Sequence, residues 1–417
     1  MKRVLIALFL GCLFFLLFIG CGKRENPVRT TYSFAGPWKL GCSDLGYASL
    51  RGDKLHSPIK WVWIYLPPQY DLERHLPLLG TGFPVLYLLH DFGDDNETFY
   101  NIYKVQQIAD RLIDNGEIQP MIIVMPDGST PYPLWGSFYA NSDLTGRYED
   151  YIRELMDIID VSFSTVATQD PDTKETIPDR RYKAISGYGM GGYGAFRLAL
   201  DYDTTLFQSV SGMSPFLSFG SFLTDEIIEE VFRENEIAED DFSDSSYKTI
   251  NPWTDSLHLQ KPITQLIFAM AAAFSPHDIT DTIPDDPYFF ELIKIGGKRY
   301  GVDLPFDSTR YISPEPGTPW DRWMSNHDIT TLFGEKGSGG GFGELKIYFD
   351  CGDFDERKLY EGAQLFDDLL SWAGIEHTYV KYPGYGNYPA GHSNFIYDRL
   401  PEILKFHSRH FPPPTWE

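Results

Sequence analysis

The sequence predicts an α/β protein in which a mostly parallel central sheet has helices on both faces and carries an inserted cap. Short apolar runs typical of buried strands alternate with stretches whose apolar residues recur at helical spacing. The alternation stops over about residues 213–344, which are rich in Asp, Pro and Phe. Since alternating strands and helices form parallel sheets that are covered on both sides, we expect this interval to be a cap inserted into the α/β core.

The predicted strands are apolar runs that end at turn residues. The run WVWIYL at 61–66 ends at Pro67 and Pro68, and the run MIIVM at 121–125 ends at a Pro-Asp-Gly sequence. The remaining predicted strands cover 85–89, 182–186, 207–210, 345–349 and 378–381. Continuous apolar runs without alternation indicate strands that are buried on both faces.

The predicted helices lie between these strands and have one apolar face each. In the first of them, Val105, Ile108 and Leu112 fall on the same side. The full set covers 105–113, 147–163, 191–200, 359–373 and 395–406.

The first residues are typical of an export signal. Lys2 and Arg3 precede an apolar run that is shorter than the roughly 20 residues of a membrane span. The run ends in LFIGC, which resembles the lipobox of bacterial lipoproteins and implies lipidation of Cys21. We therefore expect a signal peptide at 1–20, a tether at 21–35, a single α/β domain at 36–417, and anchoring to an extracytoplasmic membrane face. The alternative is an uncleaved signal anchor.

The composition restricts the partners. The chain has 35 basic and 59 acidic residues and a formal net charge of −24. A strongly acidic surface excludes nucleic acid and anionic lipid headgroups as partners. Cys42 and Cys351 can form a disulfide in an oxidising compartment, although two buried free thiols remain the alternative.

The segment ISGYGMGGYGAFRLAL at 185–200 carries the most chemical information. A strand that runs into Gly-X-nucleophile-X-Gly and then into a helix is a nucleophile elbow, which projects the central side chain above the sheet. Gly187 and Gly191 occupy the two outer positions. The central residue, where a nucleophilic serine is expected, is Gly189.

This segment resembles the elbow of an esterase family of α/β-hydrolases that includes esterase D, S-formylglutathione hydrolases and feruloyl or acetyl-xylan esterases. Further segments resemble the family in the same order: VWIYLPPQYD, FPVLYLLHDFGDD, MIIVMPDG, GSFYANSDLTGRYEDY, LKIYFDCGDFDE and AGHSNFIYDRLPEILKFHSRHF. The resemblance covers most of the chain from about residue 32 onward.

The resemblance implies an acid at Asp355, a base at His392, and oxyanion-hole amides at Phe92 and Met190. Asp353 is a weaker candidate for the acid. It implies no cofactor and no metal, and a small ester, acyl or glycan-ester ligand. One departure is Asp91, which stands where the family usually has glycine after the histidine and brings a carboxylate near the oxyanion hole.

Two functional readings follow from the missing serine. In the first, the protein is a catalytically impaired esterase that binds a ligand, because loss of the serine costs about 10⁶ in turnover. In the second, it is an active esterase that uses water activated by His392 or another nucleophile. Ser186 lies inside a strand, and Ser137, Ser142 and Ser393 lie in loops without an elbow. A serine-to-glycine change in an otherwise active enzyme is a third reading, in which Gly189 is the one obstacle to catalysis.

Overall fold

A computed structural model describes residues 33–41, 59–70, 78–79, 82–202, 206–254, 260–279, 286–295, 298–336, 342–385 and 388–413. The chain divides into two units, 1–31 and 32–417. The predicted signal peptide, Cys21 and Cys42 lie outside the described residues. Within the described part, no helix is long and apolar enough to cross a membrane.

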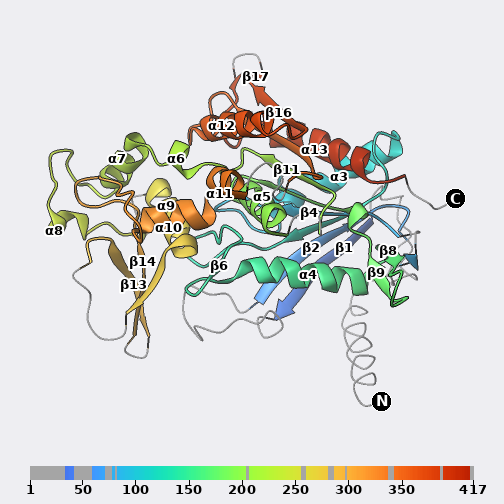
Figure 1. The fold of residues 1–417 in the computed structure, drawn as a ribbon, viewed down its shortest axis with the longest axis horizontal. Coiled ribbons are helices and arrows are strands. Elements are labelled where there is room, and N and C mark those ends of the chain that lie inside the picture. The colour runs from blue at the N-terminus through green and yellow to red at the C-terminus, as the bar shows by residue number, and fades with distance from the viewer. Residues whose placement is uncertain are drawn as a thin grey trace. The chain divides into compact units, whose positions relative to one another are not determined.

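The largest sheet has eight strands in the order β1-β2-β5-β4-β10-β11-β15-β16 (Figure 1). Strands β4, β5, β10, β11, β15 and β16 run parallel, while β1 and β2 are antiparallel additions at one edge. The bounds are β1 Ser33–Gly41, β2 Ile59–Leu66, β4 Val85–Leu89, β5 Ile122–Pro126, β10 Lys183–Tyr188, β11 Ser209–Met213, β15 Lys346–Gly352 and β16 His377–Tyr382.

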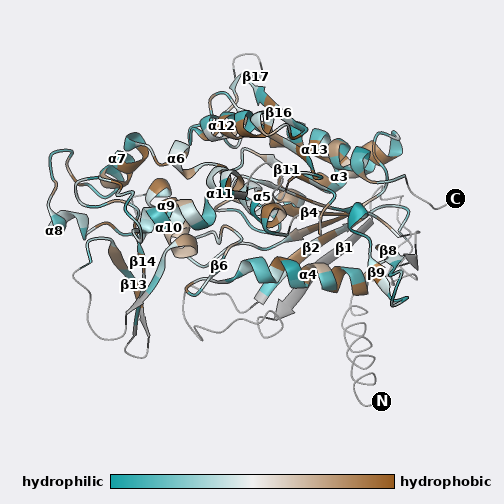
Figure 2. Cartoon of the chain, viewed as in Figure 1, coloured by the Kyte–Doolittle hydropathy of each residue, from teal (hydrophilic) through white to brown (hydrophobic). Residues whose placement is uncertain are grey.

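Helices cover both faces of this sheet. They are α2 Thr98–Asn101, α3 Val105–Asp114, α4 Tyr148–Ser162, α5 Met190–Tyr202, α12 Leu359–Trp372 and α13 Ile396–His410. Residues of α3 and α13 belong to one buried cluster, and residues of α4, α5 and α12 belong to the other. Figure 2 shows the apolar central strands between helices that present polar residues to the outside.

Side chains of the central strands alternate between the two clusters. Val85, Tyr87 and Leu89 of β4 pack into the cluster of α4 and α5, whereas Leu86 and Leu88 pack into the cluster of α3 and α13. This alternation is the period of two that a strand imposes. It explains why these strands are apolar on both sides.

The segment between β11 and β15 forms the inserted part. It contains α6 Phe219–Phe222, α7 Asp225–Glu234, α8 Asp244–Tyr247, α9 Pro262–Phe274, α10 Pro319–His327 and α11 Ile329–Lys336. It also contains a small sheet of β12 Pro276–Ile279, β13 Phe289–Ile295 and β14 Lys298–Asp303. Phe274 and Phe219 pack against Tyr193 of α5, so this segment shares the core of the sheet.

Short elements complete the described chain. They are β3 Leu78–Leu79, β6 Asn141–Ser142, β7 Gly146–Arg147, β8 Val166–Gln169, β9 Thr176–Pro178, β17 Gly384–Tyr385, β18 Tyr388–Pro389 and one 3₁₀ turn at Arg180–Tyr182.

The predicted strands and helices are present, with boundaries that differ by a few residues. Strand β1 was not predicted, and it begins at Ser33, inside the expected tether of 21–35. Its sequence contains glycine, proline and lysine, so it lacks an apolar run. Pairing with β2 forms the strand here.

Candidate active site

The elbow forms where β10 turns into α5. Gly189 has a φ of +53°, a conformation that residues with a side chain rarely adopt. A Cβ on Gly187 would lie 2.2 Å from the backbone carbon of Gly191, so strand and helix approach as closely as glycine permits. The sharp turn between strand and helix is therefore retained.

The carboxylate of Asp91 occupies the position of the missing nucleophile. A Cβ built on Gly189 would lie 1.9 Å from Asp91 Oδ1 and 2.3 Å from its Cγ. A side chain at position 189 and the carboxylate at position 91 are therefore mutually exclusive as they stand. A serine at position 189 would have to displace the Asp91 carboxylate, so the prediction that Gly189 is the one obstacle to serine catalysis depends on whether this side chain can move.

Asp91 also accepts a hydrogen bond from one of the expected oxyanion amides. The N–H group of Met190, the first residue of α5, donates to Asp91 Oδ1 at 2.7 Å. A negative charge at this end of a helix is stabilised by the backbone dipoles. Phe92 directly follows Asp91 in the loop after β4. The Asp91 carboxylate thus contacts one of the two expected oxyanion amides and lies against position 189.

His392 lies between two carboxylates. Its Nδ1 is 2.9 Å from Asp355 Oδ2, and its Nε2 is 3.0 Å from Asp91 Oδ2. All three side chains are buried. Asp353, the weaker candidate for the acid, lies instead 3.7 Å from the Nζ atom of Lys381.

Arg357 completes the centre, and it was not singled out from the sequence. Its Nη1 lies 3.2 Å from Asp91 Oδ2 and 2.8 Å from His392 Nε2. The only sequence signal is its place two residues after Asp355. An additional buried carboxylate at Asp91 creates the need for a cation, which this arginine meets.

Each charged group of the centre shifts the pKa values of its neighbours. Burial opposes ionisation of Asp91, but Arg357 and His392 outweigh it and hold the pKa of this carboxyl well below its ordinary range. Burial likewise opposes ionisation of Asp355, and His392 lowers its pKa. Burial and Arg357 lower the pKa of His392. Asp355 and Asp91 raise it by a larger amount, so the net shift of this pKa is upward. His392 Nδ1 faces Asp355, while its Nε2 lies within hydrogen-bond distance of both Arg357 Nη1, which donates, and Asp91 Oδ2.

A second histidine fixes the backbone at Asp91. His90 Nδ1 lies 2.8 Å from the Asp91 carbonyl oxygen, and the Gly128 N–H donates to His90 Nε2 at 2.8 Å. These two bonds require a neutral ring with the proton on Nδ1. The hydroxyl of Tyr139 accepts a hydrogen bond from the His90 N–H at 3.0 Å. Asp91 is thus held by its backbone as well as by its carboxylate.

Apolar groups enclose the centre. The rings of Tyr188 and Phe216 lie 5.0 and 6.3 Å from the His392 ring, measured between centroids. A Cβ on Gly136 would lie 2.7 Å from Met190 Sδ, so the loop before β6 rests on the elbow. His392 is 1% exposed and Asp91 is 3% exposed.

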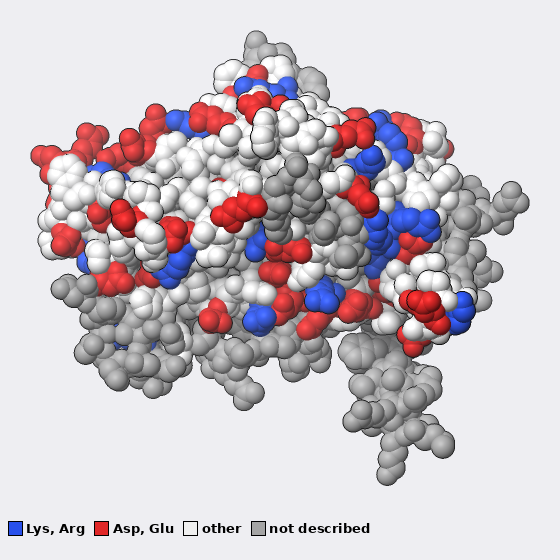
Figure 3. Space-filling model, in the orientation of Figure 1, with Lys and Arg blue, Asp and Glu red and all other residues white. Residues whose placement is uncertain are grey.

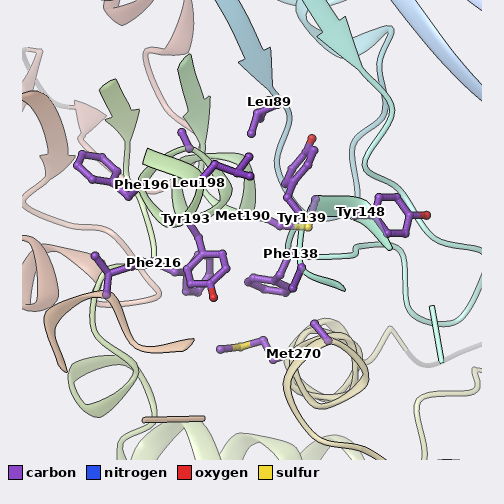
Figure 4. Packing of buried hydrophobic residues seen from close by; sticks show 14 of the residues in the cluster. Leu89, Phe138, Tyr139, Tyr148, Met190, Tyr193, Phe196, Leu198, Phe216 and Met270 are labelled. Atoms are coloured by element: carbon purple, nitrogen blue, oxygen red, sulfur yellow. The ribbon is translucent and has the colours of Figure 1, made fainter. Parts of the chain in front are cut away.

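Figure 4 shows the layer below the elbow. Met190 and Tyr193 of α5 face Phe138 and Tyr139 of the loop before β6, and Met270 of α9 lies on the other side of this layer. Side chains of the inserted segment therefore close the apolar cluster that supports the elbow.

The serines considered as substitute nucleophiles are engaged or exposed elsewhere. Ser186 is buried within β10 and accepts a hydrogen bond from Ser211 Oγ at 2.7 Å. Ser137 and Ser142 donate to backbone carbonyl groups. Ser393 follows His392 in an exposed part of its loop. None of these four candidates occupies the elbow.

Within the described ranges, one group of side chains has ligand atoms close enough to share a metal ion. His277, Asp286 and Asp303 have such atoms within 4.8 Å of one another. They lie in the inserted segment, where Arg322 already forms an ion pair with Asp303. Cys351 is a buried free thiol next to Asp355, with 3.6 Å between its Sγ and Asp355 Oδ2.

The comparison with known proteins agrees with this architecture. The model of a family described as "Putative esterase" matches residues 55–393. The chain belongs to this esterase family. Its fold is the α/β-hydrolase fold, with the elbow, Asp355 and His392 following one another along the chain.

The esterase-family relatives include enzymes named for xylan and feruloyl esters. An "Endo-1,4-beta-xylanase/feruloyl esterase" of Xylanibacter ruminicola is 28% identical over 236 residues, which are 52% of this chain and 30% of the relative. "Endo-1,4-beta-xylanase Y" of Acetivibrio thermocellus is 26% identical over 153 residues, which are 36% and 12%. The chain thus spans less than a third of the length of these relatives.

Solved structures of the same kind align over most of the chain. A ferulic acid esterase aligns over 90% of this chain and 98% of its own, with 18% identity and a TM-score of 0.49. An S-formylglutathione hydrolase from Agrobacterium tumefaciens aligns over 85% and 91%, with 16% identity and a TM-score of 0.45.

Proposed function

We propose that this esterase-family protein does not hydrolyse esters and acts instead as a binding protein for ester, acyl or glycan-ester ligands. The observation that carries the proposal is the position of Asp91, whose Oδ1 lies 1.9 Å from where a Cβ of residue 189 would be. A serine hydrolase needs an unobstructed nucleophile and a free oxyanion hole. The Asp91 carboxylate lies against the first and binds one amide of the second.

The alternative of water activated by His392 has less support. A general base needs an unprotonated nitrogen within hydrogen-bond reach of the water. His392 Nε2 faces Asp91 Oδ2 and Arg357 Nη1 at 3.0 and 2.8 Å. With both neighbours in contact, this nitrogen leaves no open direction for a water that is to be deprotonated.

An aromatic cluster beside Gly136, whose missing Cβ would lie 2.7 Å from Met190 Sδ of the elbow, supports the binding role. The ring of Tyr132 lies 5.6 Å from Trp135 and 5.3 Å from Trp253. The Tyr132 hydroxyl donates to the Thr254 carbonyl oxygen at 2.9 Å and so fixes the cluster. Trp135 is 41% exposed and has a φ of +59°, a strained conformation of the kind found at ligand-binding positions.

The choice of ligand class rests on the relatives and on charge. Two relatives are named as xylanases, and one of them also as a feruloyl esterase. Acidic side chains gather around α7 on the face drawn in Figure 3, acidic and basic side chains alternate over α4, and the formal net charge is −24. We therefore favour neutral acetylated or feruloylated xylo-oligosaccharides over free acids, which the surface would repel.

We also propose that the protein is exported and anchored to a membrane. The lipobox-like sequence before Cys21 supports a lipid anchor on the extracytoplasmic side of a bacterial membrane. Mass spectrometry of the native amino-terminal peptide tests it. The expected result is a diacylglyceryl group on Cys21, and an intact Met1 would contradict the anchor.

An esterase assay tests the loss of hydrolysis. Wild type should leave a short-chain aryl ester unchanged, whereas the double variant Asp91→Gly, Gly189→Ser should hydrolyse it about 10³- to 10⁶-fold faster. The matched control adds His392→Ala and should abolish the gain. Wild-type turnover equal to that of the double variant would overturn the proposal.

A binding assay tests the retained role. Acetylated and feruloylated xylo-oligosaccharides should quench the tryptophan fluorescence of wild type and raise its melting temperature. The Trp135→Ala variant should lose the response, while Trp372→Ala, at an 84% exposed position of α12, should keep it. A folded wild type that ignores both ligands would refute the binding role.

A further inference from the structure

We infer that the Met190 amide, Arg357 and His392 form a binding site for a carboxylate, and that Asp91 is its resident ligand, attached to the chain. The inference rests on the proposed function, because the site exists only where the nucleophile has gone. It assigns the buried centre itself a ligand class, a small monocarboxylate, separate from the ester ligand proposed at the cluster of Tyr132 and Trp135.

The donors converge on one carboxylate from separate parts of the chain. Met190 N–H reaches Oδ1 at 2.7 Å, while Arg357 Nη1 and His392 Nε2 lie 3.2 and 3.0 Å from Oδ2. They lie 99, 266 and 301 residues from Asp91 along the sequence. The arrangement is therefore a tertiary site rather than a local turn around an aspartate.

The charge of the donors matches a monoanion. Arg357 brings one positive charge at 3.2 Å from Asp91 Oδ2, while Asp355 is engaged with His392 Nδ1 at 2.9 Å. Glu356 accepts a hydrogen bond from the His392 backbone N–H at 2.8 Å, but its side chain is solvent-exposed and its charge is screened. One positive charge remains for the carboxylate at position 91.

Because the centre is buried, this charge balance strongly affects which ligand can bind there. His392 is 1% exposed, and the Arg357 side chain is 19% exposed. Charge-assisted hydrogen bonds are strong in such surroundings, and a buried cation without its partner is costly. A site built in this way binds an anion and discriminates against a neutral molecule of the same shape.

The size of the site follows from the side chain that fills it. Removing the side chain of Asp91 frees the space of one methylene and one carboxylate, which together correspond to acetate. The three atoms nearest to the missing Cβ of Gly189 all belong to the Asp91 carboxylate, so removing this side chain also relieves the crowding at position 189. The expected ligands of an opened site are therefore formate and acetate.

The test uses the full-length Asp91→Gly variant and small molecules added from solution. Sodium acetate should raise its melting temperature in a saturable way and bind with a millimolar dissociation constant by calorimetry. Acetamide, the neutral molecule of the same shape, should have no effect at equal ionic strength. Wild type should not respond to acetate, because its own carboxylate occupies the site.

Arg357 provides the internal control. Adding Arg357→Met to Asp91→Gly should weaken acetate binding by about ten- to hundredfold, since one charge-assisted contact is lost. Adding Arg181→Met, which removes a mostly exposed arginine paired with Asp179, should leave acetate binding unchanged. Equal binding by the two double variants would overturn the inference.

The test remains decisive if Asp91→Gly fails to fold in chloride buffer. Acetate must then restore the folded circular dichroism spectrum and acetamide must not. A folded variant that ignores acetate, or one that responds equally to both molecules, refutes the carboxylate site. Neither outcome tests the proposed function. The esterase assay and the binding assay described above test it separately.

Discussion

His392 and Asp355, on one side of the centre, keep the relation that a serine hydrolase requires, whereas Gly189 and Asp91, on the other side, do not. Nδ1 of His392 and Oδ2 of Asp355 are 2.9 Å apart, a distance suited to an orienting hydrogen bond. On the opposite side, Asp91 Oδ1 lies where the nucleophile would be attached. His392 and Asp355, the acid–base half of the centre, keep the arrangement of a hydrolase. Gly189 and Asp91, the rebuilt half, do not.

The difference shows why the acid–base half can persist without a nucleophile. His392 retains a hydrogen-bond partner for Nε2, because Asp91 Oδ2 lies 3.0 Å away. A buried polar group that loses its partner destabilises a fold. Asp91 supplies this partner, so Asp355 and His392 are held in place by the same kind of contacts that catalysis would use.

The largest expected effect is that of Asp91→Asn. This change keeps the shape but removes the charge that compensates Arg357 and His392, so the free energy of unfolding should fall by about 3–5 kcal/mol. Urea titration measures it. Asp172→Asn, at an exposed loop position, is the control and should change stability by less than about 0.5 kcal/mol. Similar effects of the two changes would mean that the rebuilt half contributes no stability.

A smaller loss is expected for Gly189→Ser alone. The left-handed backbone and the overlap with Asp91 together should cost about 2–4 kcal/mol, with no gain in ester hydrolysis. Gly374→Ser is the matched control, because Gly374 has a φ of +70° and nothing within 4 Å of its missing Cβ. It should cost only about 1 kcal/mol. A Gly189→Ser protein that is stable and active would show that Asp91 moves aside freely.

The smallest effect is a dependence of the Asp91 contribution on pH. His392 has a folded pKa above its ordinary 6.5, so its contribution is complete below pH 6.5 and is lost as pH rises through the folded value. Asp91 has a folded pKa below its ordinary 3.8, so its contribution is present above pH 3.8 and is lost at lower pH. The stability difference between wild type and Asp91→Asn should therefore be largest between these two values.

Above pH 6.5 this difference should decline by at most about 1.4 kcal/mol per pH unit, the value for one proton. Chemical unfolding on either side of the ordinary histidine pKa measures the decline. Burial and Asp91 raise the pKa of Asp94 to about 7, so the comparison is made in an Asp94→Asn background. A difference that stays constant with pH would show that His392 does not share its proton with Asp91.

Much of the fold could be predicted from the sequence because apolar periodicity reports burial directly. Strands such as 85–89 are buried on both faces, and helices such as 105–113 have one apolar face, so both leave a clear pattern. Strand β1 left no such pattern, because its pairing with β2 rather than its own residues defines it. The positions of Gly189, Asp355 and His392 followed from the motifs that carry the family resemblance.

The relation between Asp91 and Gly189 could not be predicted, because it depends on tertiary distance. Asp91 was noted as a carboxylate near the oxyanion hole, but the overlap at 1.9 Å requires coordinates. Arg357 was missed for the same reason, since its position two residues after Asp355 says nothing about where its guanidinium points. Residues that are far apart in the sequence but in contact in the fold leave no pattern in the sequence around either of them.

The overlap between positions 91 and 189 also constrains the order in which such a centre can arise. With glycine at 91 and serine at 189 as the starting point, an aspartate at 91 has no room until the serine has gone. Loss of the nucleophile must therefore come first, and the carboxylate second. Once both steps are complete, a serine restored at position 189 alone would overlap the Asp91 carboxylate. A return to hydrolysis would therefore have to remove the carboxylate at position 91 before a serine at position 189 has room, which is the reverse of the order in which the two changes arise.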